Sequence, residues 1–437
     1  MLQSLRNLEK PLLILLLGVL LSHLGTYIVL PMLPIMLKNN ANLNTVQIGT
    51  ILASIAIAFQ IGSIAGGVLA DRIGRRFIIG LGAFIGSFGI MGFGLFTTYW
   101  PFFITATIMG LGNGLNAPST KAAIAALASE NNRTTAFSFR GIAANIGTAT
   151  AGLIVFFLFI GTSKLIFWIA GIIYLLLTLK SWILLPKNCG DFACPKVPSS
   201  AYREAFKNKP FMVFSMISIF IWMLYAQLSL ALPLRANLIL PEPKNVALIW
   251  TINSLIVISL QGVITKKYID RVHPLSALSW GILLIGVGLF SLYFSKSFIY
   301  LVFSGAIFVF GEMLILPTID STISQLSKAE LIGLFFALSN VVSGLGEAGG
   351  KSIGGRLLEE TNILPWFTFL ITGVLLFIVV LLIKRWQPLQ NSLEKAALKP
   401  DKPKDAPHVL IEHSQHRTQP FNNWVPEVLF RRKTGIE

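Results

Sequence analysis

Charged side chains inside otherwise apolar stretches are the residues of this chain that are best placed to do chemistry. Glu312 lies deep in one long apolar run. Burial in hydrocarbon is costly for a charge and favours the neutral form of a carboxyl group, so Glu312 is predicted to bind and release a proton. The alternative interpretation is a structural carboxylate that is bonded to polar groups of neighbouring helices.

A second charged site combines Glu347 and Lys351 in another apolar stretch. Residues four apart lie one turn apart on a helix, and an acid that precedes its base is the favourable order. We therefore predict an ion pair that lets both charges stay buried. The alternative is a switchable pair, which Glu347 leaves when it is protonated or when a charged substrate arrives.

Two further polar side chains lie in apolar runs. His23 is in the middle of the first run, where a packing hydrogen bond is the commoner role for a lone histidine and a cavity-facing role is the alternative. Arg140 is predicted to make a contact that changes with conformation or to contact substrate. The alternative is that its side chain extends to the membrane surface. Aromatic residues such as Trp222, Tyr225 and Trp250 line a cavity or face lipid.

The elements that position these residues are predicted to be membrane-spanning helices. Hydrophobic residues make up 54% of the 437 residues and charged residues only 12%. Apolar runs long enough to cross a membrane recur along the chain, and the first one is read as a retained helix and not a cleaved signal. This all-α polytopic membrane protein is predicted to contain twelve spans, at 11–37, 45–70, 77–97, 101–128, 137–160, 164–185, 211–234, 245–266, 274–294, 298–320, 332–356 and 364–384.

The chain carries an internal repeat with an offset of 199 residues. Shifted by that amount, Asp71-Arg72 falls on Asp270-Arg271, Gly112 on Gly311, Pro118 on Pro317, Gly147 on Gly346 and Pro34 on Pro233. Such a duplication predicts two like-oriented, pseudo-symmetric six-helix bundles around a central path. The predicted division is a bundle at 1–185, a cytoplasmic linker at 186–210, a second bundle at 211–384 and a disordered cytoplasmic tail at 385–437.

The net charge of +16 is distributed as membrane topology requires. Lys and Arg gather in alternate loops, which places both termini in the cytoplasm and explains the basic surplus without a nucleic-acid partner. Contact with anionic membrane lipid is the expected use of that surplus. Cys189 and Cys194 fall in the cytoplasmic linker, where neither a disulfide nor a metal site is expected.

The loop after the second span carries a recognisable motif, Gly66-Gly67-Val68-Leu69-Ala70-Asp71-Arg72-Ile73-Gly74-Arg75-Arg76. It resembles the signature loop of the major facilitator superfamily, Gly-x-Leu-Ala-Asp-Arg-x-Gly-Arg-Arg/Lys. Gly67 is expected to permit close helix approach. The resemblance implies a conformational latch, made by Gly67, Asp71, Arg72, Gly74, Arg75 and Arg76 and by Asp270 and Arg271 of the second copy.

Shorter patches resemble the drug/proton antiporter subgroup of this superfamily. They are Gly311-Glu312 with Pro317, Tyr225-Ala226-Gln227, and Arg140 with Asn145-Ile146-Gly147; the fourth span adds Gly110 to Pro118 with two asparagines. The candidate proton or substrate residues are Glu312, Glu347, Lys351, Arg140, His23, Asn113, Asn116, Asn145, Tyr225 and Gln227.

The resemblance implies proton-coupled efflux of small organic compounds by alternating access, in a bacterial-type cytoplasmic (inner) membrane. Protons, a small-molecule substrate and lipid are the expected partners of a monomer, and the proton gradient replaces any cofactor. A carrier of one metabolite or siderophore is the alternative, and a non-transporting membrane sensor is a more remote one. An enzyme is not expected, because the spans carry no nucleophile–base set, metal-ligand cluster or nucleotide loop.

Overall fold

A computed structural model describes residues 9–127, 133–158, 164–186, 203, 205–242, 244–327, 332–360 and 362–397, without the side chains of Asp71, Asp270, 133–135, 332–333 and 394–397. This part of the chain is helical and contains no strand. The helices are α2 (Lys10–Val29), α3 (Leu33–Ala41), α4 (Thr45–Ile73), α5 (Arg75–Leu95), α6 (Tyr99–Leu127), α7 (Arg133–Leu158), α8 (Leu165–Leu184), α10 (Lys209–Tyr225), η1 (Ala226–Ser229), α11 (Ala231–Ile239), α12 (Asn245–Lys267), η2 (Ile269–Arg271), α13 (Pro274–Ser291), η3 (Leu292–Phe294), α14 (Phe298–Leu326), α15 (Ile332–Leu357), α16 (Leu364–Lys384) and α17 (Gln387–Ala397).

These helices fall on all twelve predicted spans. Ten helical segments of the described chain are long and apolar enough to cross a membrane. The helices at the other two predicted spans are α6 and α15, which are less apolar because α6 carries asparagines and glycines and α15 carries Glu347 and Lys351. The protein is a multi-pass membrane protein.

Two predicted spans are broken where the prediction had them continuous. The first is divided into α2 and α3, and the seventh into α10, η1 and α11. Pro34 lies in the first turn of α3, and Pro233 lies in the first turn of α11. Proline has no backbone N–H to donate and is best accommodated in a first helical turn, so each of these two prolines favours a new helix start. The two breaks are related by the offset of 199 residues.

Glycines at repeated positions make the same helix contacts in α2–α8, here called the first half, and in α10–α16, the second half. A Cβ atom added at Gly112 of α6 would lie 2.3 Å from backbone of α5, and one at Gly311 of α14 would lie 2.5 Å from backbone of α13. Gly147 and Gly346 likewise bring α7 onto α2 and α15 onto α10, each with a carbonyl oxygen 2.5 Å away. The duplication therefore specifies equivalent packing in both halves.

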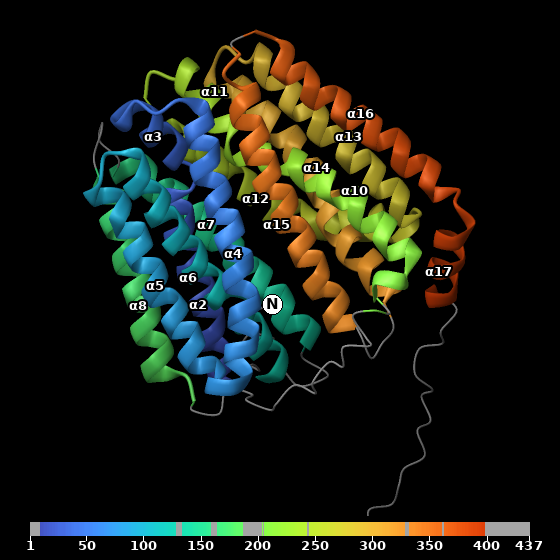
Figure 1. The fold of residues 1–437 in the computed structure, drawn as a ribbon, viewed down its shortest axis with the longest axis horizontal. Helices are drawn as coiled ribbons and strands as arrows, with labels where there is room; N and C mark the ends of the chain where they lie inside the picture. Colours follow the sequence, from blue (N-terminus) through green and yellow to red (C-terminus); the bar gives the residue numbers. More distant parts are fainter. Residues whose placement is uncertain are drawn as a thin grey trace, which may run out of the picture. The chain divides into compact units, whose positions relative to one another are not determined.

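The two halves contact one another through α4 with α15 and through α7 with α12 (Figure 1). A Cβ atom added at Gly355 would lie 2.6 Å from the Thr45 carbonyl oxygen, and one at Gly152 would lie 2.4 Å from the Ala247 carbonyl oxygen. These contacts lie at the end of the helices that also carries α3 and α11. There the side chains of Asn39 and Asn237 exchange two hydrogen bonds of 2.9 and 3.0 Å.

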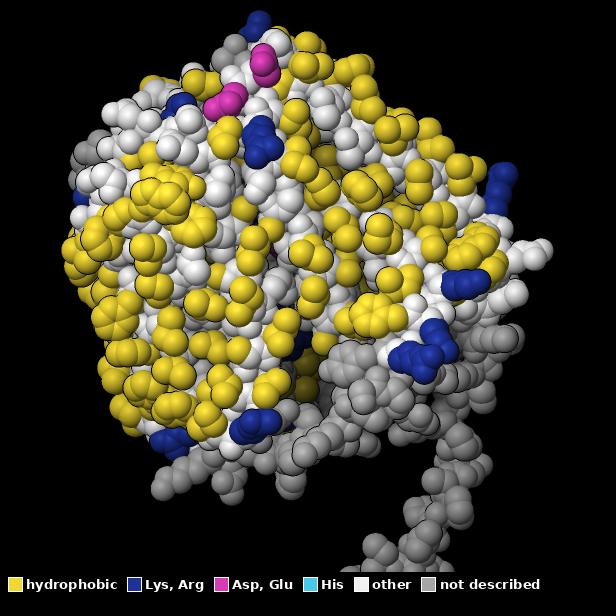
Figure 2. Space-filling view, in the orientation of Figure 1, with side chains coloured by type: hydrophobic (Ala, Val, Ile, Leu, Met, Phe, Trp, Pro, Cys, Tyr) yellow, Lys and Arg dark blue, Asp and Glu magenta, His cyan; other side chains and the backbone are white. Residues whose placement is uncertain are grey.

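The halves separate toward the opposite end of the same helices. A Cβ atom added at Gly67 of α4, Gly141 of α7 or Gly262 of α12 would have no neighbour within 4 Å. The space-filling view shows a hollow between the halves at this end, with a basic side chain in its depth (Figure 2). The expectation that Gly67 permits close helix approach is thus wrong, and Gly66 makes that contact, with Leu115.

The predicted disordered tail, 385–437, is helical over most of its described part. Its first part forms α17, in which Leu389 and Leu393 are buried against α10, α14 and α16. Two leucines four residues apart share one helix face, and this amphipathic pattern stabilises a helix that the Pro- and Lys-rich composition further on does not predict. Residues 398–437 and most of the predicted linker, including Cys189 and Cys194, lie outside the described residues.

Candidate functional site

A cavity of about 250 Å³ lies between the two halves near the middle of their helices. The first half contributes α2 and α7, and the second half contributes α10, η1, α12 and α14. The lining residues are His23, Tyr27, Ala144, Asn145, Thr148, Tyr225, Leu228, Trp250, Asn253, Ser254, Val257, Val309, Glu312 and Leu316. Because both halves supply its walls, a rocking motion of one half against the other would change which end of this cavity is open.

Glu312 is the acidic residue of the cavity wall, and α14 and α10 position it. The Tyr225 hydroxyl donates a hydrogen bond of 3.0 Å to Glu312 Oε1. Tyr225 is the last residue of α10, just before the break at η1. The predicted proton residue therefore faces the cavity and has a hydroxyl partner from another helix.

The proline that follows Glu312 in α14 fixes this region of the helix to α12. Pro317 has no N–H to donate to the carbonyl of Met313, four residues earlier. That carbonyl oxygen instead accepts a hydrogen bond of 3.2 Å from Gln261 Nε2 of α12. The carbonyl oxygen that Pro317 leaves free within α14 thus joins α14 to α12 beside Glu312.

Aromatic rings line the cavity in a row that crosses from one half to the other. The rings of His23 and Tyr27 are stacked, with centroids 5.8 Å apart and planes 11° apart. Tyr27 in turn lies against Trp250 of α12, with centroids 5.8 Å apart. Flat apolar walls of this kind suit flat or cationic organic solutes.

The charged residues of α15 form the predicted ion pair next to the cavity. Lys351 Nζ lies 3.0 Å from Glu347 Oε2, and the two side chains are 8% and 32% exposed. Tyr27 and Tyr225 are within electrostatic reach of both Glu347 and Glu312. The ion pair of α15 and the cavity acid of α14 therefore lie near the same two tyrosines.

Removing one member of this pair is expected to be worse than removing both. Glu347→Gln leaves the buried Lys351 ammonium without its partner, which is destabilising, whereas Glu347→Gln with Lys351→Met leaves no charge. Thermal unfolding of the purified protein in detergent should give the lowest Tm for the single variant, with exposed Glu359→Gln as an unaffected control. A stable double variant that transports nothing would instead make the pair functional.

Several predicted site residues serve helix packing and lie away from the cavity. Asn116 Nδ2 donates to the Ile79 carbonyl oxygen at 2.8 Å, which joins α6 to α5. Gln227 Nε2 donates to the Gly350 carbonyl oxygen at 2.8 Å, which joins η1 to α15. Asn113 lies against Gly86 within the first half. Of the predicted set, His23, Asn145, Tyr225 and Glu312 line the cavity.

Arg140 lies outside the cavity lining, on α7 toward the end where the halves separate. It is within electrostatic reach of Asp320 on α14, as is Lys121 on α6. Lys121 and Asp320 are equivalent under the repeat, so opposite charges of the two halves lie within electrostatic reach of one another here. These residues place a charged patch between the halves on the open side of the cavity.

The predicted latch loop joins α4 directly to α5. Gly74 has φ 103°, a conformation that glycine adopts without strain, and this single residue ends one helix and begins the next. Arg75 is buried, and Arg76 donates a hydrogen bond to the carbonyl oxygen of Trp182 on α8. Arg72 and Arg271 are exposed, while the side chains of Asp71 and Asp270 lie outside the described residues. The latch role stays a prediction.

Four polar cavity residues, Tyr27, Thr148, Asn253 and Ser254, are not among the residues that the sequence predicts for the site. The sequence signal for Asn253 is that it lies with two other polar residues, Thr251 and Ser254, within the apolar run of α12. Polar side chains in a span usually face the bundle interior. That rule does not distinguish packing from cavity, and Thr251 indeed donates to the Ala149 carbonyl oxygen at 2.9 Å.

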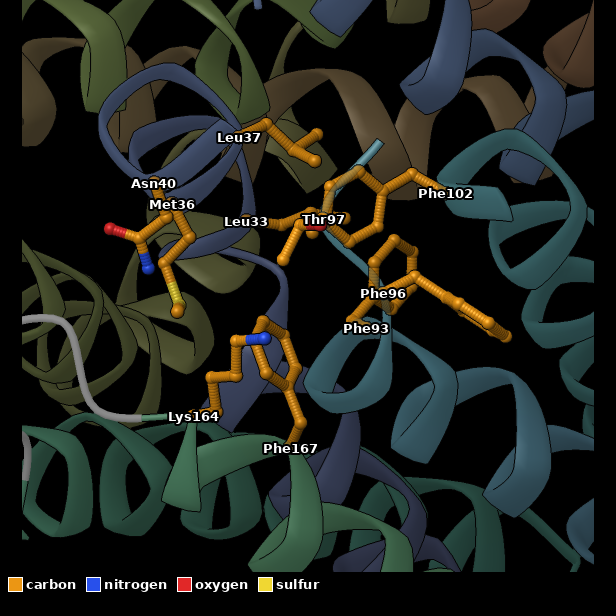
Figure 3. Close-up of a pocket in the computed structure, with 10 residues that line it drawn as sticks. All are labelled: Leu33, Met36, Leu37, Asn40, Phe93, Phe96, Thr97, Phe102, Lys164 and Phe167. Atoms are coloured by element: carbon orange, nitrogen blue, oxygen red, sulfur yellow. The ribbon is translucent and has the colours of Figure 1, made fainter. Parts of the chain in front are cut away.

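A second, smaller pocket lies wholly within the first half. Figure 3 shows the side chains that line it, mainly phenylalanine and leucine, with Asn40, Thr97 and Lys164 among them. Its volume is about 50 Å³, and its residues come from α3, α5, α6 and α8 and the segments beside them. No residue of the second half lines it, so relative motion of the halves would not alternate access to it.

Comparison with known proteins places this architecture among transporters. The sequence profile of the family described as Major Facilitator Superfamily matches residues 15–350. Multidrug resistance protein MdtH of Yersinia enterocolitica is 23% identical over 394 residues, which cover 88% of this chain and 96% of that protein. The MFS-type transporter YqjV of Bacillus subtilis is 24% identical over 350 residues, which cover 78% and 85%.

Solved structures of similar fold are also transporters. A mutant of the peptide transporter POT in complex with sulfate superimposes with a TM-score of 0.73 at 17% identity, over 88% of this chain and 95% of that one. A mutant of the nucleoside transporter NupG gives 0.73 at 15% identity, over 85% and 99%. The matched profile spans most of the chain, and its relatives are membrane transporters and not enzymes. With its two repeated halves around one shared cavity, this chain belongs to the major facilitator superfamily.

Proposed function

We propose that this transporter exports small, mostly apolar or cationic organic compounds from the cytoplasm in exchange for protons. The observation that carries the proposal is the hydrogen-bonded pair of Glu312 and Tyr225 in a cavity shared by both halves. A carboxyl group inside a membrane protein binds a proton readily, and it releases the proton when water reaches it. Its occupancy can therefore follow which end of the cavity is open.

The route of export follows from how the halves meet. They are closed at the end that carries Asn39 and Asn237 and apart at the end that carries Gly141 and Gly262. The basic loops argue that the open end faces the cytoplasm. In this state the cavity would load a compound from the inside, and separation of the α4–α15 and α7–α12 contacts would release it outside.

The aromatic row supports a broad substrate class over one dedicated metabolite. Rings of His23, Tyr27 and Trp250 offer apolar and cation-attracting surface without a dense set of charged partners. Distant relatives that carry the name multidrug resistance protein MdtH, at 23% identity, agree with this class. A carrier dedicated to a charged metabolite would be expected to pair that charge with charged side chains of the cavity.

Transport by purified protein in liposomes with an acidic interior tests the proposal. Ethidium, tetraphenylphosphonium and a neutral aromatic dye should each accumulate against their gradients, and a protonophore should abolish the accumulation. Liposomes without protein provide the control. Accumulation that ignores the pH gradient would contradict proton coupling, and accumulation of only one solute would favour the single-substrate carrier.

A further inference from the structure

A pocket of about 240 Å³ lies where α4 passes into α5, on the outside of the first half. Ile73, Gly74, Arg76 and Phe77 of that junction line it together with Trp182 of α8. Figure 1 shows α5 and α8 at the edge of the first half that lies away from the second half. None of the five residues lines the central cavity, so this pocket is separate from the proposed transport path.

The indole of Trp182 is a fixed wall of this pocket. Its Nε1 donates to the Phe77 carbonyl oxygen at 3.3 Å, and the two rings are stacked, with centroids 6.0 Å apart and planes 12° apart. A Cβ atom added at Gly80 would clash with the indole, so the glycine leaves room for the ring on α5. Arg76 donates to the Trp182 carbonyl oxygen. The ring and the guanidinium group are therefore held beside one another.

An outer strip of aromatic rings, made by Phe77, Trp182, Phe84 and Phe88, leads from the pocket along α5. The three phenylalanines are 45%, 37% and 56% exposed, and their spacing of seven and four residues places them on one helix face. The Trp182 and Phe84 rings lie 6.1 Å apart between centroids, and those of Phe84 and Phe88 lie 4.9 Å apart. Exposed rings on a membrane-spanning helix contact lipid chains.

The pocket end of the outer strip is basic. Residues 71–76 include three arginines against one aspartate. Arg76 is only half-buried, and its bond to Trp182 uses one N–H of a group that has five donors. α5 begins at Arg75 with Gly74 as its N-cap, so the positive end of this helix lies at the same pocket. These charges are complementary to an anion.

We propose that the pocket and the outer strip form a binding site for one anionic phospholipid, such as phosphatidylglycerol. The phosphate group accepts hydrogen bonds from Arg76, and one acyl chain lies along Phe84 and Phe88. A basic pocket at the end of the spans is where lipid headgroups meet a membrane protein. This site goes beyond the proposed export function and does not depend on it.

Native mass spectrometry of the full-length protein, released from micelles with equal amounts of phosphatidylglycerol and phosphatidylcholine, tests the site. The unaltered protein should retain one phosphatidylglycerol in preference to phosphatidylcholine. Arg76→Gln should weaken that binding about fivefold, the usual effect of one basic side chain on anionic lipid. Ile73→Glu places a negative charge at an exposed position of the pocket wall and should weaken it at least as much.

Arg385→Gln is the matched control, because Arg385 is an exposed arginine beside a tryptophan at the end of α16 and lies outside this pocket. It should retain the lipid as the unaltered protein does. Arg76 also bonds to α8, so if Arg76→Gln does not fold, Ile73→Glu decides alone. Equal retention of both lipids, unchanged retention in the pocket variants, or an equal loss in Arg385→Gln would each overturn the site.

A soluble phosphate is the other source of the same chemistry. Glycerol 1-phosphate has the phosphate group without acyl chains and should leave the bound phosphatidylglycerol in place. Phe84→Ala combined with Phe88→Ala removes most of the outer strip and should weaken lipid binding severalfold. Displacement by glycerol 1-phosphate, or full binding by this double variant, would contradict a lipid site. Transport is not measured, so a failure of the export proposal leaves the result independent.

Discussion

Replacing Glu312 by glutamine is expected to abolish uphill transport driven by a pH gradient. Glutamine resembles the protonated carboxyl group in shape and hydrogen-bonding capacity, and it cannot release a proton. The partner hydroxyl of Tyr225, 3.0 Å from Glu312 Oε1, can still donate to the amide oxygen. Substrate binding and gradient-independent exchange should therefore persist, because neither requires a proton to leave the site.

The measurement is the accumulation ratio of a fluorescent cation in liposomes with an imposed pH gradient. The ratio should fall to that of empty liposomes for Glu312→Gln, and Glu312→Asp should retain part of it, because the acid survives with a shorter reach. Glu359→Gln, at an exposed position beyond the end of α15, is the matched control and should behave as the unaltered protein does. Full proton-driven accumulation by Glu312→Gln would remove Glu312 from the coupling mechanism.

A valine in place of Gly355 is expected to prevent closure of the halves at the end near α3 and α11. A Cβ atom at this position would lie 2.6 Å from the Thr45 carbonyl oxygen and 3.1 Å from the Gly49 Cα, and neither backbone atom can yield without moving α4. Overpacking of this kind costs about 1–3 kcal/mol. Such a cost shifts the balance between two states by about 5-fold to 150-fold, so transport should fall severalfold or more.

Cross-linking provides a readout of closure that is independent of transport. Asn39→Cys and Asn237→Cys replace the two asparagines whose amides exchange hydrogen bonds across the halves. A short bismaleimide should join them efficiently in the otherwise unaltered protein and poorly when Gly355→Val is added. Gly262→Val is the control, because a Cβ atom there meets nothing within 4 Å. Unchanged cross-linking and transport in Gly355→Val would show that this contact does not close the cavity.

Much of the architecture is encoded in local sequence features. Apolar runs specify the spans because only a helix satisfies backbone hydrogen bonds within lipid. The offset of 199 residues relates Gly112 to Gly311, and both glycines make the same close contact in their halves. Pro34 and Pro233 are the sequence signal for the two broken spans. The sequence alone predicts both spans as continuous helices, because a proline favours the start of a helix but does not require one.

Only the tertiary structure determines which groups the polar residues of the spans form hydrogen bonds with. A span is apolar on its lipid-facing side and on its packed side alike, so hydrophobic periodicity does not reveal how each helix is rotated about its axis. Asn116 and Gln227 are therefore as plausible in a cavity as Asn145 when only the chain is read, yet the first two bond to neighbouring backbone. The ion pair of Glu347 and Lys351 was predictable because its spacing is local. The Glu312–Tyr225 bond spans 87 residues and two helices, and the packing of α10 against α14 alone determines it.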